Sequence, residues 1–448
     1  MSTRSSHDLL VIGAGSGGVR AARVAAGHGA RVAIVEEHRI GGTCVVRGCV
    51  PKKLLVYGAH FAEDLEDARR FGWQLDGAQF DWPTLRDNVL AEVTRLSGIY
   101  QQTLETHNVG IMHGRAVVTG PNSARIGDRE ITAQTLLIAT GARPQRLSVP
   151  GIEHAITSNE AFHLERLPPR ILIAGGGYIA NEFAGIFNEL GSKVTLVNRS
   201  DRILRSYDEQ IRDRLLQISM TKGIQFMFNA PLQRIDKRAD GVLVAHFGGG
   251  TSVECEALLC ATGRVPNTDD LGLSGAGVEL DALGAVRVDE YSRSTCPSIY
   301  AVGDVTNRVQ LTPVAIREGQ AFADTVFGNK PTKLDYQCIP SAVFSHPPLA
   351  GVGLTESQAR TQLGSIKVYT SDFRPMKNVL ANRNERALFK LVVDDATDRI
   401  VGAHMIGPDA PEILQVLAVA VKARLKKSQL DECVAIHPTM AEELVLMK

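Results

Sequence analysis

The chain has 448 residues, more than a single hydrophobic core usually supports, so we expect two to four domains. Lysine plus arginine equals aspartate plus glutamate at 49 each, which argues against a global basic field for nucleic acid or an anionic membrane surface. There is no apolar run of about 18 residues and no signal-peptide core, and the seven cysteines are scattered. We therefore expect a soluble, cytoplasmic protein that binds neither nucleic acid nor membrane, in which a disulfide is more often catalytic than structural.

The N-terminal residues have the pattern of a strand, a glycine-rich turn, a helix and a second strand. Apolar, β-prone runs at 8–12 and 31–36 flank the turn at 13–18, whose sequence is Gly-Ala-Gly-Ser-Gly-Gly, and the helix-like run that follows it. Such glycines let the backbone approach a pyrophosphate at the helix N-terminus, and Glu36 is placed to accept ribose hydroxyls. The pattern predicts a dinucleotide site, with a purely structural glycine turn as the alternative.

Two cysteines, Cys44 and Cys49, lie five residues apart directly after this unit. In a regular helix such side chains point about 140° apart, and their Cα atoms are too distant for a relaxed disulfide. A bridge therefore needs a distorted turn, which Gly48 allows. From spacing alone, a redox disulfide, two unrelated thiols and half of a metal site all remain open.

A second strand–turn–helix–strand pattern spans residues 170–198, with glycines at 175–177. The position of the ribose acid holds Asn198, and three arginines follow it: Arg199, Arg202 and Arg205. Without the carboxylate there is no repulsion toward a 2′-phosphate, and guanidinium groups can bind one. The unit predicts a site that prefers NADP(H) to NAD(H), with a solvated basic loop as the alternative.

Later segments repeat this organisation. Apolar strands ending in Ala-Thr-Gly, at 136–141 and 258–263, indicate two related nucleotide-binding domains. A third apolar strand, 299–304, ends in Asp304, and open α/β sheets bind ligands at the carboxyl ends of their strands. After Leu334 the pattern changes to alternating strands followed by helices, which predicts a separate α+β domain.

Seven motifs, in order, resemble the disulfide-reductase branch of the FAD-dependent pyridine-nucleotide oxidoreductases, and within it the glutathione reductases. They are the fingerprint at 13–18, GGTCVVRGCVPKK at 41–53, ATG at 139, GGGYIANEFA at 175–184, ATGRVPN at 261, YAVGD at 300 and HPTMAEE at 437–443. The resemblance implies an α/β fold with two related Rossmann-like domains and a C-terminal α+β dimerisation domain. Its segments are 1–143 for FAD, 144–263 for NADPH, 264–334 returning to the FAD or central domain, and 335–448 for the interface.

The resemblance also assigns cofactor contacts by motif position. Those to FAD are Gly13, Gly15, Ser16, Gly18, Glu36, Gly42, Thr43, Cys44, Lys52, Thr140, Gly141, Asp304 and Thr312. Those to NADPH are Gly175, Gly177, Tyr178, Ile179, Glu182, Arg199, Arg205 and Gly263. No metal site is predicted.

Five of the implied catalytic residues surround the flavin. Cys49 corresponds to the thiol beside the flavin ring and Cys44 to the interchange thiol that attacks the substrate. Lys52 corresponds to a lysine near flavin N5, Glu182 to its ion-pair partner, and Tyr178 to the aromatic gate over the ring. We expect a neighbouring cation to lower the pKa of the attacking thiol.

The remaining catalytic pair is His437 and Glu442, five residues apart. A carboxylate can fix the imidazole tautomer and raise its basicity, which leaves the other nitrogen to exchange protons with a thiol. In the family the histidine comes from the partner subunit, so the resemblance implies a homodimer with a shared active site.

The implied substrate is glutathione disulfide, whose negative charge suits basic residues. Arg20, Arg23, Tyr100 and His437 are the substrate contacts we expect, although both arginines also fit ordinary solvated helix positions. Gln320 stands where some glutathione reductases carry an arginine, which leaves the substrate open. The alternatives are another low-molecular-weight disulfide, a dihydrolipoamide dehydrogenase-like activity, or a flavoprotein that binds and signals.

Overall fold

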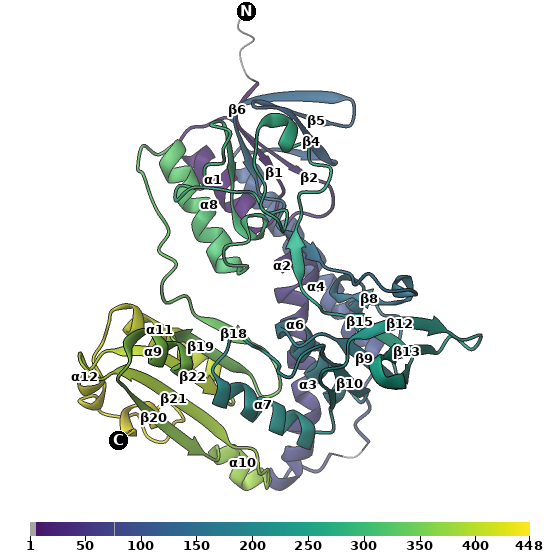
Figure 1. Ribbon diagram of the computed structural model, residues 1–448, viewed down its shortest axis with the longest axis vertical. Coiled ribbons are helices and arrows are strands. Elements are labelled where there is room, and N and C mark those ends of the chain that lie inside the picture. The colour runs from purple at the N-terminus through teal and green to yellow at the C-terminus, as the bar shows by residue number, and fades with distance from the viewer. Residues whose placement is uncertain (1–5, 76) are drawn as a thin grey trace, which may run out of the picture. The chain divides into compact units, whose positions relative to one another are not determined.

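The computed structural model describes residues 6–75 and 77–448, and the chain divides into two compact units (Figure 1). Unit 1 is drawn from Met1–Leu54, Thr84–Gln145 and Gly263–Asp335, and unit 2 from Leu55–Pro83, Arg146–Thr262 and Tyr336–Lys448. No helix among the described residues is long and apolar enough to cross a membrane.

Unit 1 is organised around a parallel sheet. Its strands, in spatial order, are β3 (Gly110–His113), β2 (Val32–Glu36), β1 (His7–Ile12), β6 (Arg129–Ile138) and β17 (Ile299–Ala301). The register sets Ile12 beside both Val35 and Ile138, and Ile138 beside Ala301. The turns that follow these strands therefore gather at one edge of the sheet.

The two faces of this sheet are covered differently. Leu9 and Val11 pack with residues of helices α1 (Ser16–Gly27) and α8 (Thr312–Val326), whereas Leu10 and Ile12 belong to the core on the opposite face. That second core includes the antiparallel strands β4 (Ala116–Gly120) and β5 (Ser123–Ile126). The other elements of unit 1 are β7 (Ala142–Pro144), β16 (Arg264–Pro266), α2 (Gly42–Arg47), the start of α3 (Cys49–Ala68), most of α4 (Trp82–Thr106), η4 (Ser274–Ala276) and η5 (Gly303–Thr306).

Unit 2 contains a second parallel sheet. Its strands, in spatial order, are β11 (Gln225–Met227), β10 (Lys193–Val197), β9 (Arg170–Ala174), β15 (Ala257–Cys260) and β8 (Ile156–Thr157). Helix α6 (Tyr178–Glu189) follows β9, and α7 (Glu209–Thr221) follows β10. An antiparallel meander of β12 (Leu232–Lys237), β13 (Leu243–Phe247) and β14 (Ser252–Cys255) accompanies the sheet. The shorter elements are η1 (Arg69–Phe71), η2 (Ile152–His154), α5 (Ser158–Ala161) and η3 (Gly248–Gly250).

The C-terminal part of unit 2 is an antiparallel sheet with helices. Its strands, in spatial order, are β18 (Ser341–Val343), β19 (Leu349–Gly353), β22 (Ile400–Ile406), β21 (Ala387–Asp394) and β20 (Ile366–Phe373). Its helices are α9 (Glu356–Leu363), α10 (Met376–Ala381), α11 (Ala410–Lys422), α12 (Lys427–Asp431) and α13 (Glu443–Leu446). The predicted fold class, two related Rossmann-like sheets plus an α+β domain, is confirmed. The division at residues 143, 263 and 334 stays a prediction.

Candidate active site

A cavity opens at the carboxyl edge of the unit 1 sheet, where ligands bind in open α/β folds. It holds about 1030 Å³ of empty space, including its opening to solvent. Residues from the turns after all five parallel strands line it, among them Gly13, Glu36, Arg115, Thr140 and Asp304. Other predicted FAD contacts in its lining are Gly15, Ser16, Gly42, Thr43, Cys44, Gly141 and Thr312.

Two predicted FAD contacts, Gly18 and Lys52, lie outside this lining. A Cβ added to Gly18 would lie 2.0 Å from the carbonyl oxygen of Gly13, so this glycine lets α1 pack against the turn, and its contact with FAD stays a prediction. Lys52 lies in the first turn of α3, and its position near a flavin stays a prediction.

Glu36, the predicted ribose ligand, also stabilises the backbone of the turns beside it. Its carboxylate accepts hydrogen bonds from the backbone N–H groups of Ala14, at 2.8 Å, and His38, at 2.9 Å. A carboxylate has about four lone-pair directions, so capacity remains for ribose hydroxyls in the cavity. The N-terminus of α1 has no acidic residue in its first turn, which suits a pyrophosphate.

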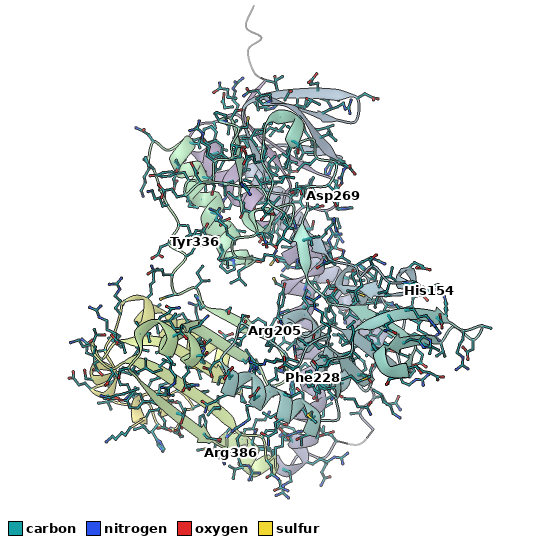
Figure 2. All side chains as sticks on the ribbon, viewed as in Figure 1. His154, Arg205, Phe228, Asp269, Tyr336 and Arg386 are labelled. Atoms are coloured by element: carbon teal, nitrogen blue, oxygen red, sulfur yellow. The ribbon has the colours of Figure 1, made fainter. Side chains whose placement is uncertain are left out.

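The sequence reasoning missed a polar group on the wall of this cavity. Arg115 pairs with Glu37 at 3.1 Å and donates to the carbonyl oxygen of Asp269 at 2.7 Å. All three line the cavity, and Asp269 is labelled in Figure 2. The position of Arg115 just after a strand could have indicated this role. Strand β3 pairs with β2 so that His113 lies opposite Glu36, and the residues after β3 therefore lie at the edge of the sheet where the cavity opens.

Asp304 lies in η5, directly after β17. Burial raises the pKa of its carboxyl group; Arg264 lowers it and Glu318 raises it further, so the net shift is upward. A carboxyl group that lines the cavity can accept hydrogen bonds from hydroxyls of a ligand.

The helical backbone is interrupted between the two cysteines at a single residue, Gly48. Helix α2 ends at Arg47 and α3 begins at Cys49, with Gly48 between them at φ −154° and ψ −118°. A Cβ on Gly48 would lie 2.7 Å from the carbonyl oxygen of Thr43, so a side chain does not fit there. The expected departure from helix geometry is confirmed.

Both cysteines are thiols in this structure, and their electrostatic settings differ. A hydrogen bond with Cys49, followed by burial, raises the pKa of Cys44 strongly, and the smaller effects of Thr312 and Lys52 do not offset the rise. The expectation of a net lowered pKa for the attacking thiol is therefore wrong for the chain by itself. Lys52 acts in the expected direction, but the adjacent sulfur and burial outweigh it.

Cys49 lies beside the start of α8. Its Sγ is 3.6 Å from Oγ1 of Thr312, the first residue of that helix. The positive end of a helix dipole favours negative charge at such a position. The two sulfurs therefore lie beside the N-terminal end of α8 and next to each other.

Of the predicted substrate residues, Tyr100 lies near both Cys44 and Arg23. Burial raises the pKa of Tyr100, negative charge on Cys44 raises it further, and the Arg23 guanidinium lowers it. These three side chains come from α4, α2 and α1, so the fold brings together groups far apart in sequence. Arg20 lies three residues before Arg23 on α1 and is half-buried. Gln320 donates to both carboxylate oxygens of Asp324, each at 3.0 Å.

The second glycine turn has the form expected of a nucleotide site. Gly177 is the N-cap of α6, whose first turn carries no acidic residue, and Tyr178 begins the helix with 44% exposure, followed by Ile179. Glu182 is buried and accepts a hydrogen bond from the Phe344 N–H at 2.9 Å. Lys52 belongs to unit 1 and Glu182 to unit 2, so their pairing stays a prediction.

The end of the predicted NADPH segment falls at a unit boundary. Gly263 begins the third segment of unit 1, and its carbonyl oxygen accepts from the Gln145 N–H at 2.9 Å. A role for Gly263 in binding NADPH stays a prediction.

Asn198 closes the basic loop that follows β10. Its buried amide donates to Ser200 Oγ at 3.0 Å and to the Arg202 carbonyl oxygen at 2.6 Å. The loop buries Ile203 and Leu204, and it exposes its arginines: Arg199, Arg202 and Arg205, the last labelled in Figure 2. Guanidinium groups on a closed loop at the carboxyl end of a strand are a donor set that fits a phosphate.

His437 and Glu442 meet in unit 2. The imidazole Nδ1 lies 3.0 Å from the Glu442 carboxylate. The carboxylate accepts a hydrogen bond from Nδ1–H, which fixes the tautomer. The His437 side chain is 78% exposed, and that of Glu442 only 14%. Glu442 is held in turn by the Thr439 N–H at 3.3 Å. Nε2 is the imidazole nitrogen left to exchange protons.

Replacing Gly48 with alanine should weaken the disulfide between Cys44 and Cys49. The added Cβ meets the Thr43 carbonyl oxygen, and alanine favours a continuous helix that separates the sulfurs. At a strain of about 1–3 kcal/mol, the thiol form should gain at least about fivefold over the disulfide in a glutathione redox buffer, measured by alkylation and mass spectrometry. Gly27→Ala, where a Cβ meets nothing within 4 Å, is the matched control. An unchanged ratio in Gly48→Ala would contradict the strained-turn account.

Comparison with known proteins agrees with this geometry. The model of the pyridine nucleotide-disulphide oxidoreductase family matches residues 7–319, and that of its dimerisation domain matches residues 339–448. A glutathione reductase of Burkholderia cepacia is 51% identical over 441 residues, which cover 98% of both chains. One from Nostoc sp. is 45% identical over 99% of both chains, and a trypanothione reductase of Trypanosoma congolense is 40% identical over 99% of this chain and 95% of its own. The chain belongs to the pyridine nucleotide-disulphide oxidoreductase family.

Proposed function

We propose that the protein reduces glutathione disulfide to glutathione with NADPH, through FAD and a redox-active pair formed by Cys44 and Cys49. The observation that carries this proposal is the placement of Cys44. It lines the large cavity and lies within electrostatic range of Tyr100, which is itself within range of Arg23. The extensive similarity to glutathione reductases supports the same substrate.

The unit 1 cavity is the FAD site in this proposal. Its turn at 13–18 holds the pyrophosphate, Glu36 the ribose, and Asp304 a hydroxyl on the flavin side. FAD, when bound there, carries electrons from NADPH to the disulfide. NADPH binds at the turn 175–177, where the basic loop receives its 2′-phosphate.

The chemistry of the protein's own residues is thiol–disulfide exchange. The Cys44 thiolate attacks one sulfur of glutathione disulfide, which forms a mixed disulfide and releases one glutathione thiolate. His437 gives that thiolate a proton. Cys49 then attacks the Cys44 sulfur, which restores the Cys44–Cys49 disulfide and releases the second glutathione.

The thiolate is the nucleophile in this cycle, so a base must accept the proton of the Cys44 thiol. We propose that the partner subunit's His437 supplies it in a homodimer. The match to the dimerisation domain, the exposure of the imidazole and its fixed tautomer support this arrangement. A cytoplasmic location is part of the proposal and rests on the scattered cysteines, which are typical of a reducing compartment.

The substrate assignment rests on charge. Arg20 and Arg23 lie on α1, Arg23 acts on Tyr100 beside Cys44, and guanidinium groups bind the carboxylates that glutathione disulfide carries. A cationic disulfide would be repelled by the same two residues.

Replacing Cys44 with serine should abolish glutathione disulfide reduction but spare reduction of the flavin by NADPH. Serine cannot form the mixed disulfide, so kcat should fall by at least about a thousandfold. Bleaching of the flavin absorbance by NADPH, followed by stopped flow, should persist. Cys433→Ser, at an exposed cysteine outside the proposed redox pair, is the control. Normal turnover in Cys44→Ser would rule out the mechanism.

Mixing two inactive variants should restore activity if the site is shared between subunits. Cys44→Ser and His437→Ala remove residues that, in the proposal, act together only across the dimer. After reversible dissociation and reassociation, about half of the dimers are mixed and each has one intact site, so activity should recover to about a quarter of wild type. Activity that stays at the level of the separate variants would show that His437 serves its own subunit.

A further inference from the structure

Helix α7 connects the basic loop to the C-terminal sheet within unit 2. Asp208, its N-cap, pairs with Lys390 of β21, and Arg214 in the helix pairs with Asp372 of β20 at 2.5 Å. Arg214 also donates to the carbonyl oxygen of Arg386, labelled in Figure 2. Charged partners from the C-terminal sheet thus hold the helix along its length.

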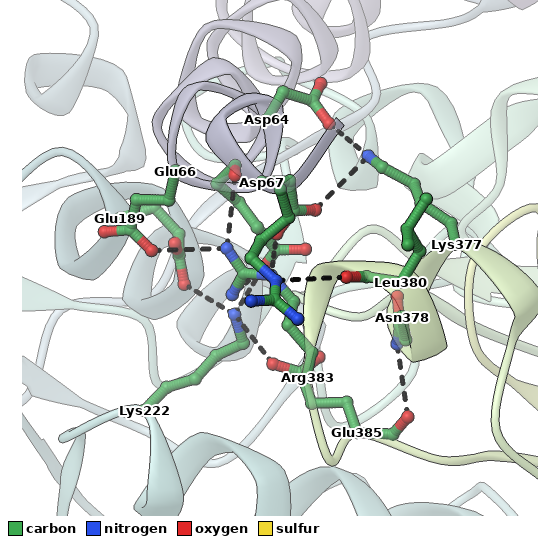
Figure 3. Close-up of polar contacts among 12 residues, drawn as sticks. Asp64, Glu66, Asp67, Glu189, Lys222, Lys377, Asn378, Leu380, Arg383 and Glu385 are labelled. Atoms are coloured by element: carbon green, nitrogen blue, oxygen red, sulfur yellow. Dashed lines mark hydrogen bonds and ion pairs between the residues drawn. The ribbon is translucent and has the colours of Figure 1, made fainter. Parts of the chain in front are cut away.

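The C-terminal end of α7, at Lys222, is held by a cluster of ion pairs. The Lys222 ammonium lies 2.6 Å from Glu63, 3.3 Å from Glu189 and 3.1 Å from Glu385. Figure 3 shows Lys222 among carboxylates that include Glu189 and Glu385, with Arg383 beside it. Burial raises the pKa of Glu63, but His346 and Lys222 outweigh that effect and hold it well below its usual range, so the carboxylate stays charged. This end of α7 is therefore fixed.

The N-terminal end of α7, at Asp208, is held by a buried ion pair. Lys390 Nζ lies 2.9 Å from Asp208 Oδ1 and 2.6 Å from Glu356, and the side chains of Lys390 and Asp208 are each 1% exposed. Asp208 also accepts from the N–H groups of Gln210, at 3.2 Å, and Glu356, at 3.1 Å. A buried charge without its partner strongly destabilises the folded protein. The position of Lys390 on β21 therefore determines where the Asp208 carboxylate lies.

The basic loop is tied at both sides of Arg205. On one side, the Leu204 N–H donates to the Gly176 carbonyl oxygen at 2.8 Å, within the second glycine turn. On the other side, Asp208 is fixed by Lys390. Between these two anchors the backbone turns once, with the Tyr207 N–H donating to Leu204 at 2.9 Å, and presents the exposed Arg205.

We propose that Lys390 is a positioning residue for nucleotide specificity, which acts through Asp208 to hold Arg205 where it binds a 2′-phosphate. The inference rests on the proposed NADPH site and extends it to a residue of the C-terminal sheet that touches no nucleotide. Lys390 lies 182 residues from Asp208 in the chain. The preference for NADPH over NADH is thus set in part by the domain that also carries His437.

The test compares ligands that differ only in the 2′-phosphate. Calorimetric titration of the holoenzyme with adenosine 2′,5′-bisphosphate and with AMP measures both affinities directly. Steady-state kinetics then gives the KM values for NADPH and NADH. In Lys390→Met, Kd for the bisphosphate should rise about tenfold while Kd for AMP changes less than about twofold. The control is Lys367→Met, at an exposed lysine of β20 paired with Asp395 at 2.9 Å, which should change neither.

A second variant covers the case in which Lys390→Met does not fold. Asp208→Asn keeps an N-cap oxygen but removes the charge that Lys390 holds, and it should weaken the bisphosphate selectively by about threefold. Equal weakening of both ligands, or no weakening, in whichever variant folds would overturn the inference. If the wild-type protein binds both ligands equally, it is the proposed NADPH site that fails, whatever the variants do.

Discussion

The break in the helix at Gly48 brings the Cys44 and Cys49 sulfurs within hydrogen-bonding reach, and most of the proposed chemistry depends on it. Two helices that meet at a non-helical residue can hold side chains together that one continuous helix would point apart. The close approach also divides the roles of the two sulfurs. Cys49 lies at the positive end of α8. The pKa of the Cys44 thiol is raised by its hydrogen bond with Cys49 and by its own burial.

In the proposed mechanism the second subunit supplies the base for Cys44. A thiol whose pKa is raised needs a base to become a nucleophile, and the imidazole that fits this role is exposed and oriented by Glu442. In a dimer that brings Nε2 of the partner subunit's His437 to Cys44, the imidazole would accept the thiol proton only in the assembled enzyme. Dimer formation would therefore be required for Cys44 to become a nucleophile.

The parts of the site with local signatures could be predicted from the sequence. The glycine turns, the strand ends and the cysteine pair follow from φ/ψ limits and spacing, and Gly48 was identified as the residue that allows the distortion. Arg115 and Asp269 were missed because they reach the cavity from loops without a motif. The raised pKa of Cys44 was missed because it depends on burial and on how closely the Cys49 sulfur approaches, which the spacing alone does not give. Asn198 was noticed only as a missing acid, yet its amide closes the loop. A buried lysine such as Lys390 carries no signal at all until its distant partner is seen.

The most direct test of the central claim is a comparison of disulfide substrates and nucleotides with the purified holoenzyme. NADPH or NADH oxidation would be followed with glutathione disulfide, lipoamide and trypanothione disulfide. The account predicts that kcat/KM for glutathione disulfide with NADPH exceeds every other combination by at least about a hundredfold, since each mismatch of charge or phosphate costs a few kcal/mol. A higher value for lipoamide with NADH, or a stable reduced flavin that no disulfide reoxidises, would contradict it.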